Sequence, residues 1–375
     1  MLYFKEINRA LKYYFNTQNA ENFGWSWVRD ISPNVQNTAE VIYCCCLFVD
    51  SLDRTEKDFV NEAAEYWLMF PSLHAAITID WIWVGMALIE YKRKWGIFNP
   101  VTNRSEDEAK VIRQVAMNKI DAAINLCAEK MKEFQNDDGG WADNKGDVST
   151  VIRTAAVLVF LSKIKNPSSE LCESVRRGRD WLVRMQNDDG GWGNIRPSDF
   201  RLDDKEYGTE ITVDVIDEQF ESNASATGYA IYALAELNRI NNRPFIKRGI
   251  TRLEAMISRA GNYGIFYEVG MRRDTVFTYR HFGTVWATLG LLSAGDQNAL
   301  SDGIRASVKY ILSLQDPISG GFKCTENSGV YTWSTVNALM FLYEVGKSIE
   351  NLAGIEYTDI ILDYIRSKAK KENNE

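Results

Sequence analysis

The chain has 375 residues, and its 43 Lys and Arg against 51 Asp and Glu give a net charge of −8. This acidic balance argues against a nucleic-acid partner over most of the surface. No apolar run approaches the roughly 20 residues of a membrane span, and no secretory signal is visible. We therefore expect a cytoplasmic protein without a membrane-spanning helix.

The first elements along the chain are predicted to be helical. Residues 1–15 predict an amphipathic helix, and residues 39–49 predict a helix that is apolar on most faces. The second helix holds Cys44, Cys45 and Cys46 in a row, which cannot share a disulfide framework and are expected as buried thiols. The whole chain has only seven prolines, which favours an all-α fold with strand content near zero.

A seven-residue sequence, Gln-Asn-Asp-Asp-Gly-Gly-Trp, occurs twice, at Gln135–Trp141 and at Gln186–Trp192. Degenerate copies stand at Gln18–Trp25, Gly261–Phe266 and Gln315–Phe322, and an eroded copy at Phe59–Tyr91. An amphipathic segment precedes each turn and an apolar segment follows it, so each repeat predicts one outer and one inner helix. Six such pairs predict an (α/α)₆ toroid, a double-layered helical barrel.

We expect one domain over residues 1–367, a charged tail over 368–375, and an insertion over 194–223 between the fourth turn and its inner helix. In each turn the Gly pair allows positive backbone angles, the Gln can cap a neighbouring helix end, and the Trp can bury its ring. The paired acids of these turns are expected as turn residues rather than acid catalysts: Asp137, Asp138, Asp188 and Asp189.

These Gln-x-x-x-Gly-Gly-Trp turns between helix pairs resemble the repeats of squalene cyclases and protein prenyltransferase β subunits. The resemblance extends from about Gln18 to Val345. It implies a toroid whose central cavity is lined by aromatic side chains at the N-terminal ends of the inner helices and holds an isoprenoid. It also implies one of two chemistries, each with its own motif.

Class II terpene cyclases of this superfamily protonate an alkene or epoxide with an Asp-x-Asp-Asp motif followed by Thr-Ala. Here the matching sequence is Asn34-Val-Gln-Asn37 before Thr38-Ala39, and amides cannot protonate an alkene. The nearest substitute is Asp214, Asp217 and Glu218, at helical spacing i, i+3, i+4, where mutual repulsion would raise at least one pKa. The alternative is a solvated acidic turn in the insertion.

Protein prenyltransferases of this superfamily use a zinc ion held by Asp, Cys and His. At the matching positions this chain has Arg280-His281-Phe282 and Tyr331-Thr332-Trp333, so we expect no zinc site. Asp274, His281 and Cys324 are the residues from which another zinc site could be formed, but their scattered positions do not match the spacing of a zinc motif. The cofactor is therefore left open, with Mg²⁺ considered only if the substrate is a diphosphate.

Basic and aromatic residues alternate ahead of the fifth inner helix. They form a candidate anion site of Arg272, Arg273, Tyr279, Arg280 and His281. Arg forks beside a helix N-terminus suit a diphosphate; the alternative is a surface loop whose arginines pair with the excess acid. Further residues at inner-helix starts are expected to converge on the same cavity, or to serve packing alone: Arg29, Asn34, Asn37, Trp81, Trp83, Arg153, Tyr331 and Trp333.

Two functions follow from this sequence. The first is an enzyme that binds an isoprenoid, with a prenyl diphosphate as one candidate, and cyclises or transfers it. The second is a toroid that has lost both chemistries and binds a lipid, a peptide or a protein partner, since a fold does not fix a function.

Overall fold

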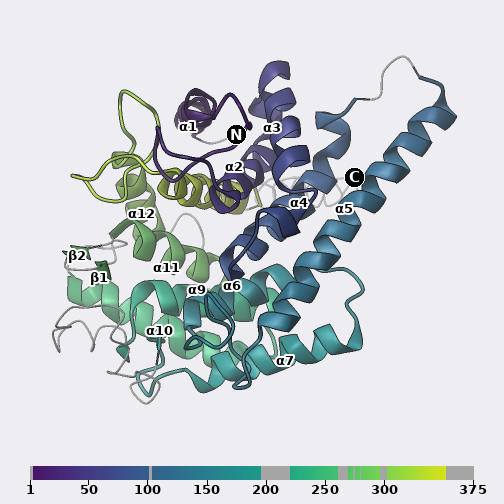
Figure 1. Ribbon diagram of the computed structural model, residues 1–375. Coiled ribbons are helices and arrows are strands. Elements are labelled where there is room, and N and C mark those ends of the chain that lie inside the picture. Colours follow the sequence, from purple (N-terminus) through teal and green to yellow (C-terminus); the bar gives the residue numbers. More distant parts are fainter. Residues whose placement is uncertain are drawn as a thin grey trace, which may run out of the picture.

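The structure is a computed structural model, and it describes residues 3–100, 104–195, 220–260, 269–272, 275–278, 280–295 and 302–351. Along these residues outer and inner helices alternate (Figure 1). The outer helices are α1 (Phe4–Thr17), α3 (Arg54–Trp67), α5 (Glu106–Phe134), α7 (Ser169–Arg184), α10 (Arg243–Ala260) and α12 (Asp302–Ser313). The inner helices are α2 (Val35–Leu47), α4 (Thr78–Phe98), α6 (Val151–Leu161), α9 (Ala224–Asn238), α11 (Arg280–Ala294) and the helix over 332–351.

These helices confirm the predicted all-α toroid. From α2 to α11 the neighbouring inner helices pack against one another, and each of these also packs against an outer helix. The α3–α4 pair is the repeat predicted without a Gly-Gly-Trp turn, and its connection contains the short helix η2 (Pro71–Leu73) instead. A second short helix, η1 (Val49–Ser51), joins α2 to α3.

One small antiparallel hairpin is present among the described residues, in agreement with a predicted strand content near zero. Strand β1 (Val269–Arg272) pairs with β2 (Thr275–Thr278) in the segment that the sequence analysis took for a loop, with Val269 opposite Thr278. Its β-branched residues, Val269, Thr275, Val276 and Thr278, suit an extended backbone.

Each turn is joined to its own helix pair by its aromatic residue. The indole nitrogen of Trp141 donates to the Met131 carbonyl at 2.7 Å, and the Trp141 backbone nitrogen donates to the Thr154 hydroxyl at 2.9 Å. Trp192 repeats both bonds, with Leu182 and with Thr227. Because the same two bonds recur, the Trp ring holds an outer helix while its backbone holds the next inner helix.

The Gln of each turn joins one repeat to the next. Gln135 Nε2 donates to the Ser174 carbonyl of α7 at 2.8 Å, and Gln186 Nε2 donates to the Phe245 carbonyl of α10 at 2.9 Å. Each amide also donates to a carbonyl of its own turn, at Gly139 or Gly190. The Gln thus contacts the neighbouring helix, but through carbonyls within its first two turns rather than through the free groups predicted at a helix end.

The first Gly of each pair adopts the predicted left-handed backbone. Gly139 has φ +97°, and a Cβ there would lie 2.9 Å from the Arg177 carbonyl oxygen. The second acid of each turn is structural rather than simply solvated. Asp138 accepts hydrogen bonds from the Gly140 backbone and from the Trp181 indole at 2.9 Å.

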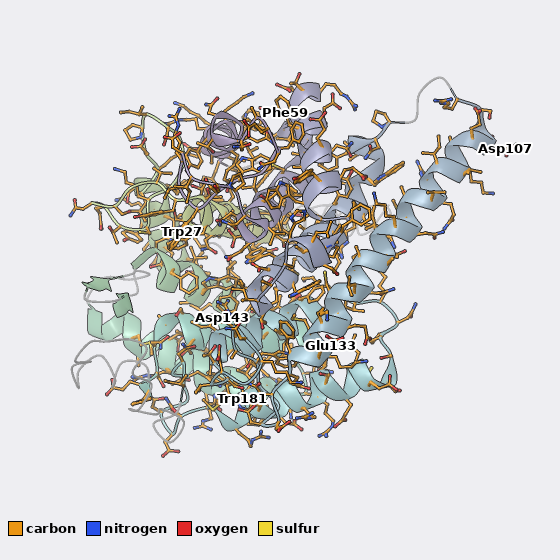
Figure 2. The ribbon with its side chains drawn as sticks, in the orientation of Figure 1. Trp27, Phe59, Asp107, Glu133, Asp143 and Trp181 are labelled. Carbon is orange, nitrogen blue, oxygen red and sulfur yellow. The ribbon has the colours of Figure 1, made fainter. Side chains whose placement is uncertain are left out.

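The core follows the inner helices. Cys44, Cys45 and Cys46 are completely buried as free thiols, as predicted. By contrast, the first part of α5 projects beyond the other helices toward Asp107 (Figure 2), and Val111 and Val115 there are more than 60% exposed. None of the helices searched in the described part of the chain is long and apolar enough to cross a membrane.

Candidate functional site

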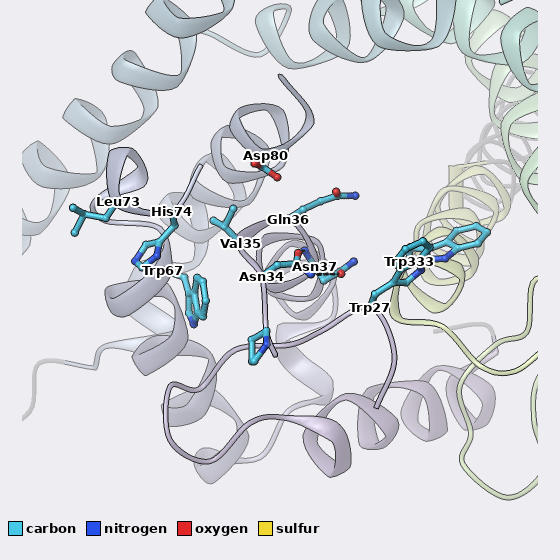
Figure 3. A pocket seen from close by; sticks show the side chains of 11 residues that line it. Trp27, Asn34, Val35, Gln36, Asn37, Trp67, Leu73, His74, Asp80 and Trp333 are labelled. Carbon is cyan, nitrogen blue, oxygen red and sulfur yellow. Dashed lines mark hydrogen bonds between the residues drawn. The ribbon is translucent and has the colours of Figure 1, made fainter. Parts of the chain in front are cut away.

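A cavity of about 650 Å³ lies at the N-terminal ends of α2 and α4. Figure 3 shows Asn34, Gln36 and Asn37 at its centre, with Trp27 and Trp333 on one side and Trp67 and His74 on the other. Asp80, at the start of α4, completes the polar part of the lining. This volume lies within the roughly 300–1,000 Å³ of small-molecule pockets.

Helix-capping chemistry explains the amides at the start of α2. The Asn34 side chain accepts a hydrogen bond from the Asn37 backbone nitrogen at 2.9 Å and so caps the helix. Thr150 caps α6 and Asn223 caps α9 in the same way. The residue that stands at the first position of the missing acid motif is therefore an N-cap in three repeats.

Asp80 is held by the start of its own helix. Its Oδ2 accepts hydrogen bonds from the Ala76 backbone nitrogen at 2.9 Å and from the Ile77 nitrogen at 3.2 Å. These donors fix the side chain of Asp80 at the cavity wall.

Glu40 is a buried carboxyl one helical turn behind the cavity-lining amides, with 3% of its surface exposed. Gln36 Nε2 donates to Glu40 Oε1 at 2.8 Å, and Asn37 Nδ2 donates to Oε2 at 2.9 Å. Burial raises the pKa of Glu40 to about 7, although these hydrogen bonds and the charge of Arg153 oppose the shift. A carboxyl of this kind exchanges a proton near neutral pH.

Glu40 is not among the site residues predicted from the sequence, although its position in an apolar helix could have identified it. Residues 35–47 contain one ionisable carboxylate among apolar, small and amide side chains, and such a charge inside a buried helix requires an explanation.

The aromatic wall of the cavity comes from segments far apart in the sequence. Tyr331 stacks on Trp333 with ring centroids 6.1 Å apart, and Trp27 lies 6.5 Å from Tyr331. The Thr332 backbone nitrogen donates to the Trp27 carbonyl at 3.0 Å, which joins the two segments directly. Of the residues predicted to converge, Asn34, Asn37 and Trp333 line the cavity, and Tyr331 contacts the lining residues Trp27 and Trp333.

His281 lies behind this wall. Its ring meets Trp333 edge-on at 5.9 Å, it is completely buried, and neither ring nitrogen makes a hydrogen bond to a described residue. Burial lowers the pKa of His281 to about 4, against a smaller opposing effect of the Ser334 backbone. At neutral pH the ring is therefore uncharged and offers no positive charge to an anion, in contrast to the role expected from the sequence.

The other predicted cavity residues divide between surface and core. Arg29 is exposed beside Asp30, with their charged groups 3.7 Å apart, and Arg153 forms an ion pair with Asp143. Trp81 and Trp83 are buried within α4, and Trp83 meets Tyr43 edge-on at 5.8 Å. Neither Trp lines the cavity, so for both the packing alternative fits the described structure better.

Several predicted site residues lie outside the described residues. These are the acids Asp214, Asp217 and Glu218, the anion-site residues Arg273 and Tyr279, and most of the insertion, residues 196–219. Arg272 is described only as part of β1, and Arg280 only as the first residue of α11. In the part of the chain that is described, no three His, Cys, Asp or Glu side chains form a group able to hold a metal.

Comparison with known proteins adds to this geometry. A family model described as the squalene-hopene cyclase C-terminal domain matches residues 109–283. The terpentedienyl-diphosphate synthase of Kitasatospora griseola is 40% identical over 77 residues, 20% of this chain and 15% of that protein. The squalene–hopene cyclase of Zymomonas mobilis is 25% identical over 184 residues, 49% of this chain and 26% of the relative.

Solved structures share the fold across nearly the whole chain. A type II terpene cyclase variant, MstE from Scytonema, covers 92% of this chain and 97% of its own, with 12% identity and a TM-score of 0.54. The family model, the curated relatives and the shared fold together support a member of the terpenoid cyclase superfamily. An α-1,6-mannanase of Salegentibacter has the same ring, with 12% identity, a TM-score of 0.62, and 92% and 98% of the two chains covered. The ring of the terpenoid cyclases is thus shared with a glycosidase, and the alignments with the curated cyclases span at most 26% of their lengths.

Proposed function

We propose that this terpenoid-cyclase toroid binds an isoprenoid in the cavity at the N-terminal ends of its inner helices and cyclises or transfers it. The observation that carries the proposal is the cavity itself, which combines the rings of Trp27, Trp67 and Trp333 with a few polar groups. Aromatic faces bury hydrocarbon and stabilise carbocations, the intermediates of isoprenoid chemistry.

Two relatives support the substrate class. One is named for a diphosphate product, terpentedienyl diphosphate. The other was crystallised with geranylgeranyl dihydroxybenzoate, its substrate. A prenyl diphosphate as the substrate of this chain, bound by Arg272, Arg273 and Arg280, is therefore part of the proposal. Asp217, with Asp214 or Glu218, is one candidate for the proton donor, and loss of product in Asp217→Asn would assign the proton transfer to it. Mg²⁺ would take part only with such a diphosphate.

The test is product formation from a panel of geranylgeraniol, geranylgeranyl diphosphate and squalene, followed by gas chromatography and mass spectrometry. Trp333→Ala is expected to lower kcat/KM by about 5- to 30-fold, because an aromatic contact to a cationic intermediate is worth about 1–2 kcal/mol. The matched control is Phe59→Ala on the outer helix α3, where the ring is 37% exposed. Equal activity of Trp333→Ala and Phe59→Ala would mean that this cavity is not where the isoprenoid reacts.

A second candidate function is a binding module without chemistry. The specific observation in its favour is that the family's acid motif consists here of amides, Asn34, Gln36 and Asn37. Quenching of tryptophan fluorescence by the same panel, without any new product, would identify a lipid-binding module. Conversion by the wild type with loss of product in Asp217→Asn would instead assign the acid to the insertion.

A further inference from the structure

We propose that Glu40 is the proton donor of this cavity, displaced by one helical turn from the position where the family's motif holds its acid. This inference rests on the proposed function and names the catalytic residue for it. The observations behind it are helix geometry, burial, and the hydrogen bonds that Glu40 accepts.

Helix geometry brings the Glu40 carboxyl into contact with two amides that line the cavity. Gln36 and Glu40 are separated by four residues, so they lie on the same face of α2. Side chains in a helix lean toward its N-terminus, so the long Glu40 side chain reaches back to the turn that holds Gln36 and Asn37. Both contacts are made, at 2.8 and 2.9 Å, and both partners line the cavity. The Glu40 carboxyl therefore lies directly behind the amides that occupy the positions of the missing acids.

The surroundings favour the protonated form of Glu40. The ionisable groups that act on it come from five helices: Tyr14 of α1, Cys44 of α2, Asp80 of α4, Arg153 of α6 and Tyr229 of α9. Arg153 forms its ion pair with Asp143, and no described cation forms one with Glu40. Burial without a paired cation raises the pKa of this carboxyl to about 7, which suits a general acid at neutral pH.

The amides acquire a role in this arrangement. After proton transfer Glu40 is a carboxylate, and each of its oxygens then accepts one amide hydrogen bond, from Gln36 and from Asn37. These donors stabilise the conjugate base and so keep the buried group acidic enough to give up its proton. Gln36 and Asn37 stand at positions where the family's motif has acids. Their amide groups therefore suit a chain in which the acid is Glu40, one helical turn further along α2.

The Glu40 O–H bond breaks, its proton bonds to the less substituted carbon of a terminal trisubstituted double bond, and the π pair becomes the new C–H bond. The tertiary carbocation left behind is attacked by the π pair of an internal double bond, which closes a ring. Loss of a proton to water from the carbon beside the final cation restores a double bond. Glu40 then takes up a proton from water, so the net reaction is an isomerisation.

The experiment compares Glu40→Gln with wild type on the isoprenoid panel, with Glu90→Gln as the matched control. Glu90 is a similarly buried carboxylate of the inner helix α4, paired with Arg93. Glu40→Gln is expected to lose product formation by at least about 100-fold, the usual contribution of a general acid. Binding of a saturated analogue, phytanol, should change by less than threefold, because it needs no proton. In D₂O the wild-type product should gain one deuterium per molecule.

A second measurement does not depend on the folding of Glu40→Gln. The wild-type kcat/KM should fall as the pH rises through about 7, as the donor form is lost. Gln36→Ala should move this fall to higher pH, because the carboxylate loses a hydrogen bond. Wild-type activity in Glu40→Gln, or a pH profile that Gln36→Ala leaves unmoved, would overturn the assignment to Glu40. A wild type that neither binds nor converts any isoprenoid would instead overturn the proposed function.

Discussion

Gln315 Nε2 donates to the backbone carbonyl of Glu6 at 2.8 Å, although the two residues are 309 positions apart in the chain. It is the same bond that Gln135 makes with α7 and Gln186 makes with α10. The last turn therefore bonds to α1 in the way that the earlier turns bond to the next outer helix. This bond joins the last repeat to the first, so the repeats form a closed ring. Arg9 of α1 strengthens this closure by donating to the carbonyl of Asp316 at 3.1 Å.

The closing bond should contribute measurably to stability. Gln315→Ala is expected to lower the free energy of unfolding by about 2 kcal/mol, because two carbonyls, of Glu6 and Gly320, lose a donor. The matched control is Gln18→Ala, whose amide donates within its own turn to the Phe23 carbonyl. Urea denaturation of both variants measures the difference, and equal midpoints would mean that the closing bond adds nothing.

Glu40 should make stability depend on pH in a predictable direction. Its pKa is about 7 in the folded chain and lies near 4.3 in an unfolded one. Between these values the folded state holds the proton and the unfolded state does not, so wild-type stability falls as the pH rises from about 4.5 to 7. Glu40→Gln removes this loss, which amounts to at most about 4 kcal/mol.

The measurement is the difference in Tm between Glu40→Gln and wild type at pH 5 and at pH 8. The difference should shift in favour of the variant at the higher pH, while Glu90→Gln serves as the buried, ion-paired control. A difference that stays constant across this range would mean that Glu40 is ionised throughout.

His281 should act in the opposite sense. Its pKa of about 4 in the fold lies below the roughly 6.5 of an unfolded histidine, so the folded state resists protonation. Stability is therefore complete above pH 6.5 and is lost as the pH falls toward 4, with about 2 kcal/mol lost at pH 5. Urea midpoints of wild type and His281→Gln at pH 7 and pH 5 should converge as the wild type weakens; parallel changes would contradict the assignment.

The turn glycines allow steric and conformational effects to be separated. Gly139 and Gly146 both have positive φ, +97° and +93°, but only at Gly139 would a Cβ meet backbone, the Arg177 carbonyl oxygen at 2.9 Å. Gly139→Ala is expected to cost about 1–3 kcal/mol more than Gly146→Ala, since both share the strain of an Ala at positive φ. Thermal denaturation of the pair tests this, and identical melting temperatures would mean that α7 moves aside freely.

The ring was predictable because its information is local and repeated. Gln135–Trp141 and Gln186–Trp192 carry the Gly angles, the Gln bonds and the buried Trp in seven residues each, and the helix periodicity is visible between them. The predictions for Asn34, Asn37, Tyr331 and Trp333 followed from the register of these turns, which places inner-helix starts together. The hairpin β1–β2 was missed because its basic and aromatic residues indicate a binding loop as readily as two short strands.

The burial and the charge of His281 and Glu40 could not be predicted from the sequence. His281 stands among arginines in the chain and is a candidate anion ligand by that pattern alone, yet in the fold its ring is buried against Trp333. Glu40 is an ordinary glutamate by its letters, and only packing against other inner helices deprives it of water. The sequence by itself determined the helix pairs and the turns, since these depend on residues close together in the chain. The tertiary structure alone decided which segments enclose the cavity and which groups carry charge there, because desolvation depends on neighbours that only ring closure brings together.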